Sequence, residues 1–189
     1  MDRSGARLLQ AVHRLALKEP EERRRIVTRL TQTQKRALNE YWPAWRHEGQ
    51  EEPAGEWRTW LMQAGRGFGK TRAGAVWVSE VARAGGAGVR IALVGATFDE
   101  VRKVMIEGRS GLIAVAGTGE AVEWKVSTGR LVFASGAEAF VYSGENPEKL
   151  RGPEHHFAWC DEIAKWAYPE ATWHNLQLGL RLGSGRGRW

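Results

Sequence analysis

The chain of 189 residues is long enough for one well-buried domain, and its 42% hydrophobic content argues against a disordered protein. Its formal net charge of +6 is compatible with a polyanionic partner such as nucleic acid, and equally with an ordinary basic surface. The single cysteine, Cys160, excludes an internal disulfide framework and a cysteine-rich metal site; without a membrane-length apolar run or a secretory signal, we expect a soluble, cytoplasmic protein.

The first 46 residues are predicted to be helical. Residues 7–17 and 21–41 carry apolar side chains at helical intervals, and Pro20 lies at the junction, where the first turn of a helix tolerates proline. The basic residues around 23–25 are partly offset by nearby glutamates, so a solvated helical face is the favoured interpretation. The polar segment 47–56 contains glycine and proline and is predicted to be a linker.

The most informative motif is the glycine-rich stretch from Gln63 to Thr71. Its glycines allow backbone N–H groups to wrap a phosphate chain, and a helix that begins near Lys70 would point its positive end at the same oxygens. In such a loop the lysine reaches the β- and γ-phosphates, and the threonine that follows offers its hydroxyl to Mg²⁺. The predicted nucleotide-binding residues are Ala64, Gly65, Arg66, Gly67, Phe68, Gly69, Lys70 and Thr71.

Ala64 departs from the motif, since a glycine usually occupies this position, but a small residue can enter a tight turn at negative φ. The flanks support the motif: residues 60–62 predict a short buried strand, and residues 71–82 have the apolar spacing of a helix. The alternative is a flexible glycine-rich loop that ends in an ordinary lysine. The order of strand, loop and helix favours the phosphate loop.

Further strands are predicted downstream. Residues 89–95 form an apolar run of strand length, and Thr97 has Glu100 three positions later, the spacing of a capping box for a helix that reaches about residue 107. Short strands joined by tight turns are predicted at 123–126, 130–134 and 139–142. We therefore expect the α/β fold of P-loop NTPases, with a mostly parallel central sheet flanked by helices and preceded by a helical N-terminal segment. The expected domains are a helical segment (1–46), a linker (47–56), an incomplete ATPase core (57–183) and a Gly/Arg-rich tail (184–189).

Residues 156–162 have the pattern of an apolar strand that ends in two acids. At the carboxyl end of a strand next to the phosphate-loop strand, such acids would point at the bound phosphates. Asp161 is predicted to help hold Mg²⁺ and Glu162 to polarise an attacking water, so that ATP is hydrolysed rather than only bound. Alone, an acidic pair also marks ordinary strand ends and helix caps; the upstream phosphate loop makes the catalytic interpretation the favoured one.

These motifs together resemble a known family. Residues 64–74, Val-Gly-Ala-Thr at 94–97 followed by 99–108, and Leu-Arg-Gly-Pro at 150–153 ahead of the acids are similar to the ATPase domain of tailed-phage and prophage terminase large subunits. The similarity runs from about Trp57 to Gly183. It implies an ATPase motor that docks on a portal protein, works with a terminase small subunit, assembles into a homo-oligomeric ring and drives double-stranded DNA into a capsid.

The resemblance also assigns roles to single residues. It implies a γ-phosphate contact for Arg66 and an arginine finger, supplied to a neighbouring subunit, for Arg151; a planar guanidinium suits both tasks. The alternatives are a solvated loop charge for Arg66 and a surface ion pair with Glu148 or Glu154 for Arg151. The other implied roles, for phosphate, Mg²⁺ and water, fall on Lys70, Thr71, Asp161 and Glu162.

Two residue types have a structural explanation. Most of the 10 tryptophans are expected in the core or in helix packing rather than on a base-stacking surface. The adjacent His155 and His156 would point to opposite sides of an extended strand, so we do not expect them to share a metal.

The chain departs from the family at its C-terminal end. Terminase large subunits continue with a coupling motif and a nuclease domain, whereas this sequence ends in the tail 184–189, which has no apolar face. We expect an ATPase fragment, weakly active or inactive, with the flank of the strand before Asp161 exposed. A frameshifted or degraded prophage gene would explain it, and a functional short product is the alternative. The alternatives to a terminase ATPase are another P-loop nucleic-acid motor such as a helicase, and a non-catalytic prophage remnant or adaptor.

Overall fold

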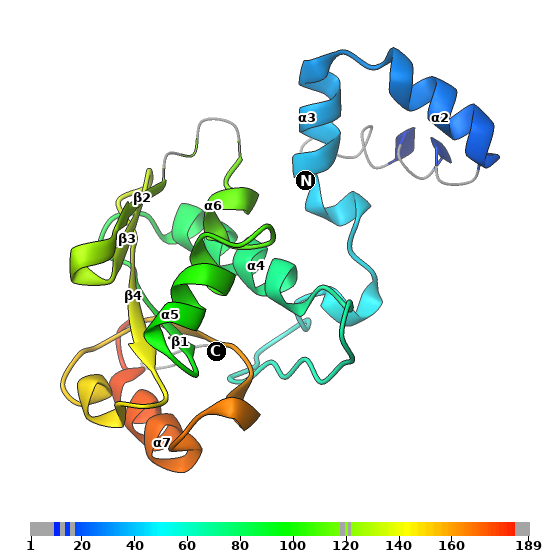
Figure 1. Ribbon diagram of the computed structural model, residues 1–189. Helices are drawn as coiled ribbons and strands as arrows, with labels where there is room; N and C mark the ends of the chain where they lie inside the picture. Colours follow the sequence, from blue (N-terminus) through cyan, green and yellow to red (C-terminus); the bar gives the residue numbers. More distant parts are fainter. Residues whose placement is uncertain (1–9, 12–13, 16–17, 118–119, 121, 184–189) are drawn as a thin grey trace. The chain divides into compact units, whose positions relative to one another are not determined.

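The computed structural model describes residues 10–11, 14–15, 18–117, 120 and 122–183 (Figure 1). It divides the chain into two compact units, one ending at Gly49 and the other beginning at Gln50. Most of the helix expected at 7–17 and the whole of the tail 184–189 lie outside the described residues. None of the helices in the described part of the chain has the length and apolarity to cross a membrane.

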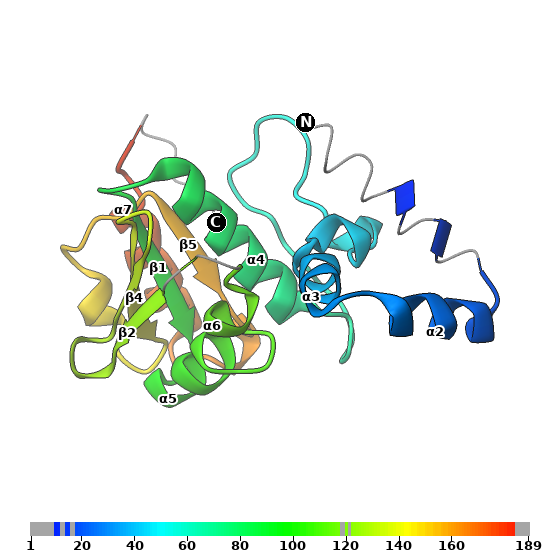
Figure 2. The same ribbon diagram turned by 90° about the horizontal axis from the view of Figure 1, so that it is seen from above.

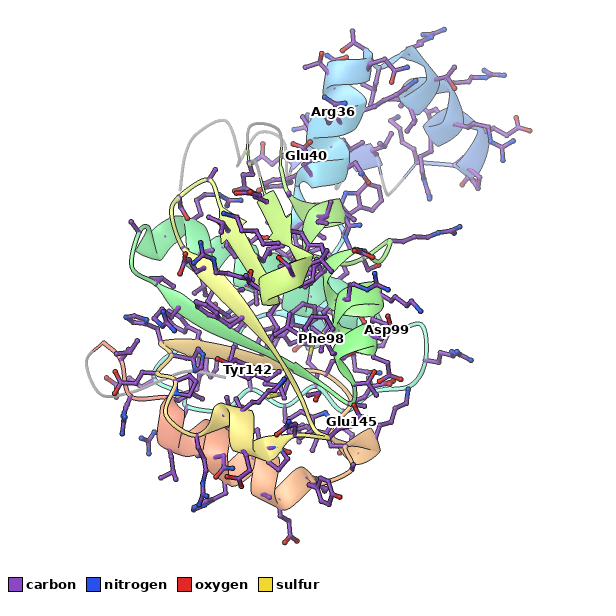
Figure 3. The ribbon with its side chains drawn as sticks, turned by 60° about the vertical axis from the view of Figure 1, so that its left-hand side comes forward. Arg36, Glu40, Phe98, Asp99, Tyr142 and Glu145 are labelled. Carbon is purple, nitrogen blue, oxygen red and sulfur yellow. The ribbon has the colours of Figure 1, made fainter. Side chains whose placement is uncertain are left out.

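The N-terminal unit contains two helices where the sequence pattern predicted a single one at 21–41. Helix α2 spans Pro20–Arg29 and helix α3 spans Gln32–Glu40, with Arg36 and Glu40 on α3 labelled in Figure 3. The break is caused by Thr31: its hydroxyl accepts from the N–H of Gln34 at 3.2 Å, and the Gln34 side chain accepts from the Thr31 N–H at 2.9 Å. This capping box starts a new helix inside a continuous apolar pattern.

The second unit is built on a five-stranded sheet. Its strand order is β2-β3-β4-β1-β5; β1 pairs in parallel with both β4 and β5, while β2, β3 and β4 form antiparallel pairs. The α/β fold class with a parallel sheet centre is therefore confirmed. The short helix η2 (Glu48–Gln50) spans the boundary between the two units. The elements of the second unit are α4 (Lys70–Gly85), β1 (Arg90–Gly95), α5 (Phe98–Glu100), η3 (Val101–Ile106), α6 (Leu112–Val115), β2 (Val122–Lys125), η4 (Val126–Thr128), β3 (Arg130–Phe133), β4 (Glu138–Ser143), η5 (Pro147–Leu150), β5 (Phe157–Cys160), η6 (Ile163–Lys165) and α7 (Pro169–Gly179).

Helices cover both faces of this sheet, because the buried side chains of the central strand alternate between two cores. Ile91 and Leu93 of β1 pack with α4, η3 and α6, whereas Ala92 and Val94 pack with η5 and α7. Figures 1 and 2 show α4 and α7 on opposite sides of the sheet. A strand that is apolar on both faces is the pattern of a parallel sheet interior.

Helix α4 approaches the sheet closely at Gly74. A Cβ at this position would collide with the ring of Trp159 on β5, with one ring carbon only 2.8 Å away. Gly74 is fully inside the core layer, so the absence of a side chain lets the helix that follows the phosphate loop lie directly on the strand that carries the acids.

One predicted strand is absent. Residues 60–62 are not paired with any strand, and Leu61 is 75% exposed, so the buried strand expected before the phosphate loop is wrong. The outer edge of β5, which pairs only with β1, stays unpaired, because an apolar groove of about 460 Å³ separates β5 from the segment 59–63. A strand forms only where its backbone groups find partners.

The helix predicted after Thr97 is present with an altered winding. The Thr97 hydroxyl accepts from the N–H of Glu100 at 3.0 Å, as the capping spacing predicted. After the single turn of α5, however, η3 is a π-helix rather than an α-helix. Figure 3 shows Phe98 and Asp99 at the start of this segment.

Candidate active site at the carboxyl edge of the sheet

The glycine-rich stretch forms an open loop that leads directly into α4. Gly67 and Gly69 adopt φ values of +83° and +89°, a region that favours glycine, and α4 begins at Lys70. A Cβ at Gly65 or Gly67 would meet no atom within 4 Å, so the backbone at these two positions borders open space. The loop therefore has the free backbone surface and the helix N-terminus that a phosphate chain requires.

The side chain of Lys70 is folded over this loop. Its Nζ donates hydrogen bonds to the carbonyl oxygens of Ala64, at 2.6 Å, and Gly65, at 3.0 Å. These bonds hold the ammonium group inside the curve of the loop, where a phosphate oxygen would compete with neutral carbonyls for it. Since charge-assisted bonds to anions are the stronger ones, the lysine can exchange these carbonyls for phosphate.

Asp161 follows the last residue of β5 at the carboxyl edge of the sheet. Its N–H continues the parallel ladder by donating to the Val94 carbonyl oxygen at 2.9 Å, and its own carbonyl accepts from the Trp166 indole at 3.0 Å. Burial raises the pKa of the Asp161 carboxyl above its ordinary value, and the neighbouring Glu162 charge raises it further, while Lys165 and Lys70 act in the opposite direction. The carboxylate is thus half-buried and lies within the electrostatic reach of the loop lysine.

Glu162 has an unusual backbone conformation. With φ +45° and ψ +55° it is the one residue other than glycine with positive φ in the part of the chain that the structure describes. A glutamate in this left-handed region is uncommon, and such strain is often found at functional positions. The conformation turns the chain sharply from β5 into η6, and the Glu162 carboxylate forms an exposed ion pair with Lys165.

The phosphate loop and the acidic pair share one groove. This cavity of about 860 Å³ is lined by the loop and the first residues of α4, by both acids after β5, and by the turn that follows η3. Residues that lie about ninety positions apart in the sequence are therefore brought to one site. The predicted residues among its lining are Ala64, Arg66, Gly67, Phe68, Gly69, Lys70, Thr71, Asp161 and Glu162.

The two predicted arginines occupy different environments. Arg66 is exposed on the loop and lines the groove. Arg151 does not line it; its guanidinium lies 3.0 Å from the Glu148 carboxylate, and both side chains are about two-thirds exposed. Within this chain, then, Arg151 forms the surface ion pair that was its alternative explanation.

Gln50 belongs to the loop as well, although the sequence pattern placed it in a linker. It is buried, and its side-chain amide donates a 2.6 Å hydrogen bond to the carbonyl oxygen of Phe68. A Cβ at Gly69 would collide with the same amide nitrogen. The sequence offered no signal for this residue, because a single glutamine in a polar stretch is indistinguishable from a solvated one.

The adjacent histidines His155 and His156 differ in burial. His155 is fully buried and bonded to the Tyr142 hydroxyl at 3.0 Å, whereas His156 is partly exposed. No group of three His, Cys, Asp or Glu side chains gathers into a metal site among the residues described. A Mg²⁺ ion would accordingly depend on Asp161, Thr71 and nucleotide phosphates, the kind of ligand set that Mg²⁺ commonly uses.

The sequence that forms this site matches the model of a known protein family. The model, described as "Terminase large subunit, T4likevirus-type, N-terminal", matches residues 61–186, well over half of the chain. The chain belongs to this terminase family. Among curated proteins, none matches the sequence.

Part of this chain is similar to solved terminase structures. The large terminase ATPase domain of Thermus phage P74-26 is 22% identical, with a TM-score of 0.46, over 60% of this chain and 53% of that one. A large terminase from another thermophilic bacteriophage is 14% identical, with a TM-score of 0.49, over 65% of this chain and 30% of that one; a further crystal form of it, in complex with ATP-gamma-S, is 12% identical, with a TM-score of 0.44, over 62% and 27%. This terminase chain spans about half of the first domain and less than a third of the second protein.

Proposed function

We propose that this terminase chain binds ATP with Mg²⁺ in the groove between the phosphate loop and the acidic pair, and hydrolyses it. The observation that carries the proposal is the shared groove itself, which Lys70 lines from the loop side and Asp161 and Glu162 line from the end of β5. A flexible glycine-rich loop without a phosphate-binding role is not expected to face two acidic residues across an open cavity. A triphosphate with its metal ion fills such a space and carries the charge that both sides accommodate.

Each predicted residue has a task in this arrangement. The loop N–H groups and the Lys70 ammonium would bind the β- and γ-phosphates, and Arg66 would contact the terminal phosphate. The Thr71 hydroxyl and Asp161 would hold the metal ion, which when bound supplies charge neutralisation for the phosphoryl oxygens. Glu162 would orient the attacking water and accept its proton, and the strained turn at this residue positions its carboxylate at the groove.

We further propose that the ATPase serves a DNA-packaging motor in the longer protein. Family membership supports this role, and with it double-stranded DNA, a portal protein and the terminase small subunit as partners, a ring-shaped homo-oligomer and action in the host cytoplasm. Arg151 is exposed outside the groove of its own chain, which suits a finger that acts on a neighbouring subunit. The family assignment favours this motor over a helicase, and a non-catalytic remnant is the outcome that the experiment below would reveal.

The test is phosphate release by the full 189-residue chain, with and without double-stranded DNA, together with binding of a fluorescent ATP analogue. We expect Lys70→Ala to lose nucleotide binding. We expect Glu162→Gln to retain binding but to lose about 100-fold or more in turnover, because the general base is removed while the phosphate contacts remain.

The outcomes separate the candidates. Binding without turnover in the wild type would indicate a nucleotide-binding remnant, and the absence of both would refute the site. If Glu162→Gln hydrolysed ATP as fast as the wild type, the catalytic assignment of this residue would be wrong even though the site binds nucleotide.

A further inference from the structure

A tight turn at residues 107–111 forms a wall of the groove that no sequence motif marked. It follows η3, whose inward face is anchored in the core by Met105 and Ile106. The π-helical winding is visible in the N–H of Glu107, which donates to the carbonyl oxygen of Arg102, five residues earlier, at 2.8 Å. Single turns of this kind are rare and occur frequently at functional sites.

The turn is closed at both ends by glycines that have no room for a side chain. A Cβ at Gly108 would lie 2.6 Å from the carbonyl oxygen of Val104, and one at Gly111 would lie 2.7 Å from that of Ile106. The Gly111 N–H also donates to the Gly108 carbonyl at 2.9 Å. Arg109 is therefore displayed on a turn whose backbone is packed against the end of η3, and it lines the groove.

The charge of Arg109 is unmatched within the described part of the chain. The neighbouring cations are engaged: Lys103 lies 2.6 Å from the carboxylate of Asp99, which Figure 3 labels, and Lys165 is paired with Glu162. The Arg109 side chain is exposed and has no hydrogen-bond or ion-pair partner among the described residues. A well-anchored turn thus presents a guanidinium to the cavity that also holds the phosphate loop.

We propose that Arg109 is a second phosphate-binding arginine, which contacts the outer phosphates of a bound nucleoside triphosphate from the turn after η3. The inference rests on the proposed nucleotide site and adds a residue to it. A guanidinium group forms stronger hydrogen bonds with phosphate oxygens than with water, because the bonds are charge-assisted and can be bidentate. The closely packed glycines at both ends of the turn hold the Arg109 backbone at the groove. Because η3 is packed into the core, this contact would link η3 to the bound nucleotide when the outer phosphates are present.

The test is the affinity of the full chain for a fluorescent non-hydrolysable ATP analogue and for the matching ADP derivative. We expect Arg109→Gln to weaken the triphosphate by about tenfold or more and the diphosphate clearly less, since a charge-assisted contact to the outer phosphates is lost. Arg109→Lys should recover part of the affinity because it restores the charge without the fork. The matched control is Arg102→Gln, on the π-helix that precedes the turn, whose guanidinium is paired with Asp99 and which does not line the groove.

Each result decides the proposal. Unchanged triphosphate affinity in Arg109→Gln, while Lys70→Ala loses it, would overturn the role of Arg109 and leave the proposed function intact. An equal loss in Arg102→Gln would overturn it too, by showing a general charge effect instead of a contact. If the wild type bound no nucleotide, the proposed function and this inference would both fall. Thermal unfolding of Arg109→Gln without nucleotide should match the wild type; a lowered melting temperature with equal loss of both nucleotides would assign the residue to structure instead.

Discussion

The side-chain amide of Gln50 donates a 2.6 Å hydrogen bond to the backbone carbonyl oxygen of Phe68 and so attaches a residue from the polar stretch to the phosphate loop. The loop residue next in sequence, Gly69, passes so close to this amide that any side chain there would collide with it. The path of the loop at the start of α4 is therefore set partly by a residue outside the motif.

Replacing Gln50 should loosen the phosphate loop. We expect Gln50→Ala to weaken ATP-analogue binding several-fold and to lower the free energy of unfolding by about 1–2 kcal/mol, because a part-buried hydrogen bond to the Phe68 carbonyl is lost. Urea denaturation and a binding titration measure the two effects. The control is Gln34→Ala, which removes a side-chain hydrogen bond from the capping box of α3 in the other unit and should leave nucleotide binding unchanged. Equal binding by Gln50→Ala and the wild type would contradict this role.

The two predicted arginines should separate in a binding experiment. Arg66 lines the groove, so Arg66→Ala is expected to reduce the affinity for an ATP analogue by about tenfold. Arg151→Ala removes an exposed ion pair outside the groove, so this variant should bind the analogue like the wild type. Any effect of the substitution should be confined to the rate of ATP hydrolysis by assembled oligomers. A loss of binding in Arg151→Ala would place this arginine in the nucleotide site of its own chain.

The strained conformation of Glu162 predicts a trade-off between the stability of the protein and its activity. Glycine ordinarily costs about 0.5–1 kcal/mol through the entropy of the unfolded chain, but at φ +45° it relieves a comparable or larger strain. We expect Glu162→Gly to unfold at a urea concentration no lower than Glu162→Gln, the control that removes the same charge and the same ion pair with Lys165. Both variants should be inactive. A glycine variant that is less stable by about 1 kcal/mol would show that the backbone carries no strain here.

Buried His155 predicts a loss of stability in acid. Burial lowers the pKa of His155 from 6.5 to about 4, with Arg90 and His156 contributing, so the folded state holds the ring neutral next to Tyr142. The unfolded chain takes up this proton near pH 6.5 and the folded chain only near pH 4, so the stabilisation is present at neutral pH and is lost as the pH falls through this interval.

Urea denaturation between pH 7 and about pH 4.5 measures this effect, which we expect to be on the order of 2 kcal/mol. His155→Phe should show a shallower pH dependence, whatever its stability at neutral pH. The exposed His174 offers the control, because His174→Gln should keep the slope of the wild type. A slope in His155→Phe equal to that of the wild type would assign the acid sensitivity to other groups.

The sequence by itself determined the parts that depend on local spacing. The glycines before Lys70 and the apolar pattern of residues 71–82 predicted the loop and α4, and the apolar runs predicted the parallel strands β1 and β5. Glycine conformations, helical spacing and doubly buried strands are each encoded within a few residues, so they are readable without knowledge of the fold.

Only the tertiary structure decided the features that depend on partners distant in sequence. The segment at 60–62 is apolar but forms no strand, because an apolar groove separates it from β5, the edge strand of the sheet. Gln50 is bonded to the phosphate loop and Arg109 lines the groove, through contacts and turns that no local pattern encodes. A side chain becomes part of a site through what the fold places beside it, and that information lies in long-range packing rather than in the order of residues around it.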